Sequence, residues 1–192
     1  MLEGSVLMDP DEELVAPTIE VRPNKAIPIT IGVFLVLGGL FTLLGGVSTM
    51  YNGTQERNQS YYDSQVVAMS ILGVETTVED LQTWDEAMLD AGFFTASGAV
   101  QTIAGLGMVG SAVLLFMGRK LGVWVGAGAT GLNFFGSIVL NQWASSIETD
   151  IGISLQSSSD VLFNAISMSC GLFCFLLPFV PLMFAAGRAA LD

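Results

Sequence analysis

Four long stretches of the chain contain no charged side chain, and this feature limits the possible folds more than any other. They cover residues 26–55, 91–118, 121–147 and 161–187. A helix needs about 20 apolar residues to cross the hydrocarbon core of a bilayer, so each stretch is long enough to span it. We therefore expect an all-α integral membrane protein, a bundle of four transmembrane helices at residues 26–50, 91–118, 121–145 and 161–187.

The charges that flank these stretches predict the direction of each crossing. When the spans alternate, the basic ends all fall on one side, at Arg22, Lys25, Arg119, Lys120 and Arg188. Arg57 is the one basic residue on the other side. An excess of lysine and arginine marks the cytoplasmic face. We therefore expect a multi-pass protein of the cell membrane, with cytoplasmic tails at 1–25 and 188–192 and outer segments at 51–90 and 146–160.

The distribution of acidic residues restricts the partners that the protein can have. The chain has 18 acidic and 6 basic residues, which gives a formal net charge of −12. Eleven of the acidic residues fall in or beside the two outer segments, and the predicted N-terminal tail is also acidic. Such a charge repels nucleic acid and anionic lipid head groups. We expect an acidic outer face and no nucleic-acid partner.

The first outer segment has the pattern of a small helical domain. Thr76 or Thr77, followed by Glu79 or Asp80, matches a capping box and predicts a helix over 78–90. Leu81, Trp84 and Met88 would form its apolar stripe, with Asp85 off that stripe. The apolar content of residues 61–74 predicts a second short helix.

Small residues recur every seven positions in the first three spans. Lipid gives helices no hydrophobic reason to associate, so small residues that let two backbones approach usually form the contacts. A seven-residue repeat keeps one face in contact over a left-handed supercoil. We therefore predict a left-handed four-helix bundle whose packing positions include Gly32, Gly39, Gly46, Gly98, Gly105, Gly122 and Gly136.

The third span also carries a stripe of uncharged polar residues. Thr130, Asn133, Ser137 and Asn141 are spaced 3, 4 and 4 apart, so they share one helix face. They form either interhelical hydrogen bonds that fix the register or the wall of a water-filled path. The stripe contains no ionisable group, which favours the first alternative.

Several chemistries lack the residues that they require. The chain has no histidine, no acidic or basic side chain within a span, and no phosphate-binding loop. We therefore expect no catalytic residue, no metal site and no cofactor. Cys170 and Cys174 are interpreted as two small buried apolar side chains. Asn58 begins a glycosylation sequon, Asn58-Gln59-Ser60, on the predicted outer side.

These observations leave two functions open. The first is a non-catalytic structural or accessory subunit, which packs laterally in the bilayer as a homo-oligomer or within a larger membrane complex. The alternative is a homo-oligomeric channel, in which the polar stripe lines a pore and the acidic rim favours cations. Tight lateral helix packing fits both.

Overall fold

The computed structural model describes residues 22–55, 57–71, 73–153 and 158–191, with only the backbone described at 158–164 and 167. Every regular element in these residues is a helix. The helices are α1 (Ala26–Asn52), α2 (Gln59–Ile71), α3 (Val78–Asp90), α4 (Phe93–Phe116), α5 (Leu121–Ile151), α6 (Ser158–Leu176), the 3-10 turn η1 (Leu177–Phe179), α7 (Val180–Met183) and α8 (Ala185–Arg188).

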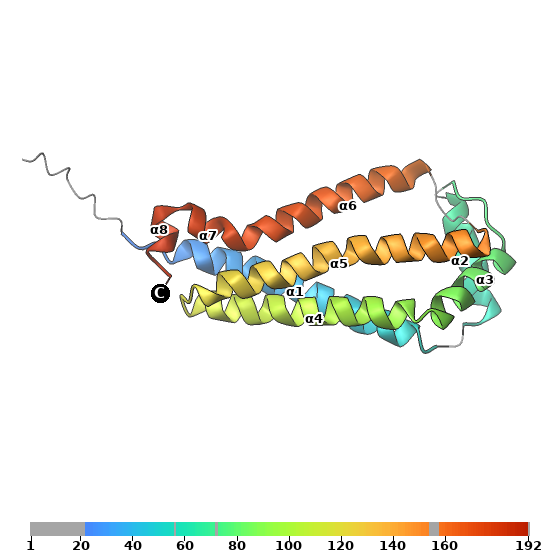
Figure 1. The fold of residues 1–192 in the computed structure, drawn as a ribbon, viewed down its shortest axis with the longest axis horizontal. Coiled ribbons are helices and arrows are strands. Elements are labelled where there is room, and N and C mark those ends of the chain that lie inside the picture. The colour runs from blue at the N-terminus through green and yellow to red at the C-terminus, as the bar shows by residue number, and fades with distance from the viewer. Residues whose placement is uncertain (1–21, 56, 72, 154–157, 192) are drawn as a thin grey trace, which may run out of the picture.

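Three of these helices, α1, α4 and α5, are each long and apolar enough to cross a membrane. They lie side by side along the length of the molecule, with α4 in contact with both α1 and α5 (Figure 1). Most of their large apolar side chains on the outer surface are exposed, as expected for helices that face lipid rather than water. The chain is thus an all-helical protein whose three long apolar helices suggest a membrane protein.

The predicted fourth span at 161–187 is not one continuous helix. It divides into α6, η1, α7 and α8, and Pro178 and Pro181 each lie at the start of a new element. Proline lacks the N–H that a helix interior needs, so both residues end the preceding hydrogen-bond ladder. The apolar part among the described residues, Met168–Met183, is shorter than α1, α4 or α5.

The predicted packing glycines lie where neighbouring helices approach closely. A Cβ atom on Gly46 would lie 2.7 Å from the backbone oxygen of Gly98, and one on Gly105 would lie 2.7 Å from that of Gly39. These two contacts are seven residues apart along antiparallel α1 and α4. Gly32 faces the ring of Phe116 at the same interface.

The α4–α5 interface uses the remaining two packing glycines. A Cβ atom on Gly122 would lie 2.9 Å from the backbone nitrogen of Leu115, and one on Gly136 would lie 2.8 Å from Val100 Cγ1. A buried hydroxyl adds a polar contact, because Ser111 Oγ donates to the backbone oxygen of Gly122 at 2.7 Å. The side chains at 122 and 136 must therefore be small for α5 to lie this close to α4.

One end of the bundle is closed by a compact apolar core. Leu35, Met108, Leu115 and Val123 are buried there, and Leu191 near the C-terminus covers them. The backbone N–H of Asn24 donates to the backbone oxygen of Ala186 at 3.0 Å. Residues just before α1 and just after α7 therefore meet at the same end of the molecule, opposite α2 and α3 (Figure 1).

At the other end, α2 and α3 form a small cap on the adjoining ends of α1, α4 and α5 (Figure 1). Thr77 caps α3: its hydroxyl accepts from the backbone N–H of Asp80, and the Asp80 carboxylate accepts from that of Thr77. The hydrogen bond from the Thr77 hydroxyl, followed by that from its backbone N–H, holds the pKa of Asp80 below its usual range. Gly92, at φ 71°, separates α3 from α4.

The helix α5 extends beyond the predicted boundary of the third span. It continues past residue 145 to Ile151 and ends at Gly152, whose φ is 70°. The first part of the predicted outer loop at 146–160 is therefore helical, while residues 154–157 lie outside the described part. This extension brings Glu148 to the cap, where α3 packs against α5.

Candidate functional site

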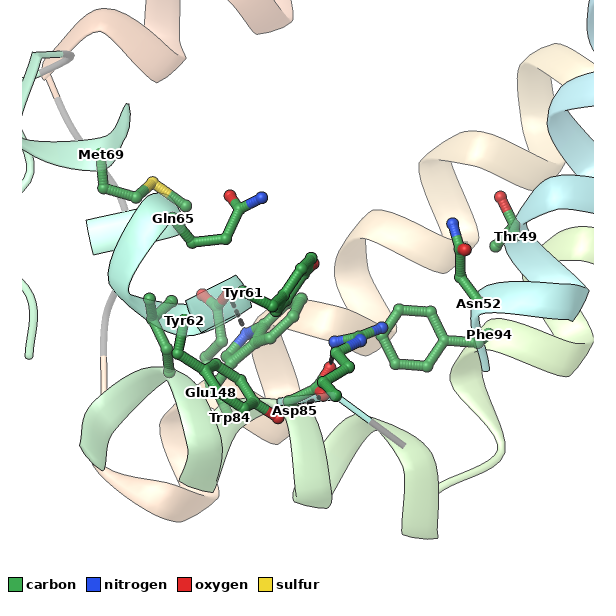
Figure 2. A pocket seen from close by; sticks show the side chains of 12 residues that line it. Thr49, Asn52, Tyr61, Tyr62, Gln65, Met69, Trp84, Asp85, Phe94 and Glu148 are labelled. Carbon is green, nitrogen blue, oxygen red and sulfur yellow. Dashed lines mark hydrogen bonds and ion pairs between the residues drawn. The ribbon is translucent and has the colours of Figure 1, made fainter. Parts of the chain in front are cut away.

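A cavity of about 380 Å³ lies within the cap. Its walls come from the C-terminal ends of α1 and α5, from α2 and α3, and from the start of α4 (Figure 2). Its lining residues are Thr49, Asn52, Arg57, Tyr61, Tyr62, Gln65, Met69, Leu81, Trp84, Asp85, Phe94 and Glu148. Pockets that bind small molecules begin at about 300 Å³, so this cavity is large enough for a small ligand.

A buried ion pair between Arg57 and Asp85 is part of the lining of this cavity. Asp85 is only 2 % exposed, and its Oδ1 pairs with a guanidinium nitrogen of Arg57. Its Oδ2 accepts a hydrogen bond of 3.1 Å from the hydroxyl of Tyr62. A buried carboxylate requires such partners, because its transfer from water without them is very costly.

Aromatic rings surround the guanidinium of Arg57. Its Cζ atom lies 5.1 Å from the ring centroid of Tyr61 and 5.1 Å from that of Phe94. Trp84 packs edge-on against Phe94, and its indole N–H donates to Glu148 Oε1 at 3.1 Å. This hydrogen bond joins α3 to the C-terminal end of α5, so one wall of the cavity attaches the cap to the long apolar helices.

The burial of Asp85 differs from what was predicted for the apolar stripe of α3. Asp85 lies on the buried face of α3 between Leu81 and Met88, and the prediction that it is off the apolar stripe was wrong. The spacing of these three residues, 4 and 3, is as regular as that of the predicted stripe. The signal that the prediction missed was Arg57, the one basic residue of the outer segments, which a buried carboxylate would need as a partner.

The polar stripe of α5 lines a second cavity, of about 330 Å³, among α1, α4 and α5. Asn133, Ser137 and Asn141 contribute from α5, and Ser97 and Gln101 contribute from α4. The other described lining residues are Thr42, Phe93, Val100 and Leu140. We call this cavity the polar groove.

The members of the predicted stripe differ in their surroundings. Thr130 is buried and donates to the backbone oxygen of Gly126 at 2.8 Å, so its hydroxyl is satisfied within α5. Asn133 is half-buried, while Ser137 and Asn141 are exposed. Ser137 donates to the backbone oxygen of Phe134 at 2.7 Å. The groove therefore brings three of the four residues together, and Thr130 is not part of its described lining.

Three further residues from the sequence analysis lie outside both cavities. Cys170 and Cys174 are exposed on α6, so the prediction that they are buried was wrong. Asn58 is exposed before the first turn of α2, where its Oδ1 accepts from the backbone N–H of Tyr61 at 3.0 Å. Within the described ranges, no group of three or more histidine, cysteine or acidic side chains is arranged to hold a metal ion.

Comparison of the chain with protein-family models, with curated proteins and with solved structures finds no match. The features of the chain that bear on its function are the cap, the polar groove and the helix surfaces.

Proposed function

We propose that the protein is a non-catalytic accessory subunit of a membrane assembly, which binds its partner laterally through the polar groove. In this proposal the chain crosses the cell membrane four times, as a left-handed bundle, with both termini in the cytoplasm. The fourth crossing is formed by α6 together with η1 and α7. The position of Lys25, Arg119 and Arg188 at one end of the bundle supports this orientation.

The polar groove is the observation that carries the proposal. Ser137 and Asn141 are exposed on α5, within the predicted span or close to its outer end. Lipid tails cannot hydrogen-bond an asparagine amide, whereas a partner helix can do so. Three uncharged amide side chains, those of Gln101, Asn133 and Asn141, line the groove and each can both donate and accept.

An open glycine on α1 provides room for a partner helix beside the groove. A Cβ atom on Gly38 would contact no described atom of the chain within 4 Å, in contrast to the packing glycines. Gly38 lies four residues from Thr42, a groove residue, so α1 presents small and polar side chains at the edge of the groove. We infer that the partner is a transmembrane helix with small and amide side chains at its contact face.

The packing of the inner half of the bundle favours an accessory subunit rather than a pore that runs through a single chain. The α4 face that carries Ser97 and Gln101 continues inward through Ala104 and Met108, which are 0 % and 5 % exposed. Most buried side chains of this half are apolar, and the buried hydroxyls of Ser111 and Thr130 donate to backbone oxygens, so the groove is confined to the outer half. A channel would therefore require several chains around a shared path.

Replacement of both Asn133 and Asn141 by leucine should weaken the partner interaction about thirtyfold, because each of the two interhelical polar contacts contributes about 1 kcal/mol. The amount of co-purified membrane protein, measured after mild detergent extraction, reports this change. Val139→Leu is the matched control, since Val139 is exposed on the same helix and is absent from the described groove lining. If the double variant and the control retain equal amounts of partner, the groove is not the binding surface.

The two native cysteines test the proposed fourth span. Because Cys170 and Cys174 are exposed on α6, they should face lipid and remain unlabelled by a charged, membrane-impermeant maleimide in intact cells. Both cysteines should react with the maleimide once the membrane is dissolved in denaturing detergent. A cysteine introduced by Glu86→Cys, at an exposed position of the cap, should be labelled from outside. Labelling of Cys170 and Cys174 in intact cells would rule out the fourth span.

A further inference from the structure

We propose that the cap cavity binds a small quaternary ammonium cation. The cavity is lined by residues of the cap and of the outer helix ends, and it is separate from the polar groove, which has different described lining residues. This inference therefore goes beyond lateral assembly and rests on independent observations.

The aromatic lining of the cavity already stabilises one cation. The guanidinium of Arg57 lies 5.1 Å from the centroids of both Tyr61 and Phe94. Such distances are within the range of cation–π attraction, which strengthens where water is partly excluded. Tyr61 and Trp84 also line the remaining space, as Figure 2 shows. A second cation in this space would meet aromatic surface of the same kind.

The charges of the cavity favour a monovalent cation. Arg57 and Asp85 neutralise each other, which leaves the Glu148 carboxylate as the net charge of the described lining. The Oε1 atom of Glu148 accepts from Trp84, an arrangement that fixes the carboxylate beside an aromatic ring. Arg57 is the one basic residue between Lys25 and Arg119, and the outer segments are acidic, so the surrounding field attracts cations.

The lining fits an organic cation better than a metal ion. Calcium requires six to eight oxygen ligands, and the described residues contain no group of three or more acidic, cysteine or histidine side chains suited to a metal. Four of the twelve lining residues are instead aromatic. A quaternary ammonium group needs no hydrogen-bond acceptor and is recognised through aromatic faces and one counter-charge.

Titration of the purified protein with tetramethylammonium chloride tests this inference. In lipid nanodiscs, the indole N–H signals of the three tryptophans can be followed by NMR, with Trp84 assigned from the Trp84→Phe variant. We expect a saturable shift of the Trp84 signal that sodium chloride at the same ionic strength does not produce. The signals of Trp124 and Trp143 should move much less.

Two variants and one control separate a binding site from a general salt effect. Glu148→Gln keeps an acceptor for the Trp84 indole N–H but removes the negative charge. Tyr61→Leu removes one aromatic ring. Each variant should raise the dissociation constant for tetramethylammonium about tenfold. Glu86→Gln is the control. It removes an exposed carboxylate that is not part of the described lining, and it should leave the dissociation constant unchanged. An identical response to sodium and tetramethylammonium, or equal affinities in Glu148→Gln and Glu86→Gln, would overturn the proposal.

Discussion

Gly105→Ala should destabilise the folded protein by about 2–3 kcal/mol, although the same substitution in a free helix is favourable. The added Cβ atom would lie 2.6 Å from the backbone nitrogen of Leu43 and 2.7 Å from the backbone oxygen of Gly39. Both are backbone atoms of α1, which cannot move aside as the end of a flexible side chain can. The substitution must therefore separate α1 from α4 along their whole interface.

The same helix offers a matched control for this substitution. Gly110→Ala is also a glycine-to-alanine change within α4, but its Cβ atom would meet nothing within 4 Å. It should be neutral or stabilise the protein by up to about 1 kcal/mol. Unfolding in mixed micelles, followed by circular dichroism, gives both values. Equal stabilities of the two variants would mean that α1 and α4 do not pack through these glycines.

Arg57→Ala should destabilise the cap by about 3–5 kcal/mol, because it leaves the buried Asp85 carboxylate without its charged partner. Asp85 would retain only the hydrogen bond from Tyr62, which cannot balance a full negative charge. We expect faster amide hydrogen exchange in α2 and α3, since Arg57 holds the chain before α2 against α3. Exchange in α1 and α4 should change little, because their contacts lie at the glycine interface.

A double-mutant cycle distinguishes the ion pair from a loss of packing. Arg57→Gln alone and Asp85→Asn alone should each destabilise the cap, whereas Arg57→Gln combined with Asp85→Asn should restore part of the loss, since no unpaired charge remains. Glu86→Ala is the control, because this neighbouring carboxylate is exposed and should cost less than about 0.5 kcal/mol. Additive effects of the two single substitutions would show that Arg57 and Asp85 do not interact.

Much of the architecture can be predicted because lipid imposes simple rules on sequence. Uncharged stretches of sufficient length predict α1, α4 and α5, and the capping box at Thr77 predicts the first residue of α3. The seven-residue spacing of small residues places Gly39, Gly46, Gly98 and Gly105 on facing surfaces. These features depend on local pattern, which the sequence displays directly.

The features that were missed depend on contacts between distant residues. The burial of Asp85 follows from Arg57, which lies 28 positions earlier in the chain, and helical periodicity does not encode that pairing. Likewise, Glu148 reaches Trp84 only because α5 continues beyond the expected end of its span. The sequence contains the lone arginine and the aromatic residues of the cap cavity, but it does not show that they lie together, so the cavity could not be predicted.

The polar groove illustrates an intermediate case. The spacing of Asn133, Ser137 and Asn141 places them on one face, but only the structure shows that Ser97 and Gln101 of α4 share their cavity. It also shows that Thr130 is satisfied by its own helix and lies apart from the groove. Helix pairing, which decides which polar faces meet, is a tertiary property that a single sequence does not reveal.

The most direct test of the proposed accessory role is the mass and composition of the complex extracted from its native membrane in a mild detergent. The proposal predicts a complex heavier than the 20.3 kDa chain, with a different membrane protein present at a fixed ratio. A single 20.3 kDa chain without a partner would contradict lateral assembly. A ring of identical chains would contradict the accessory role and favour the channel, whose conductance could then be measured with Asn133 and Asn141 replaced.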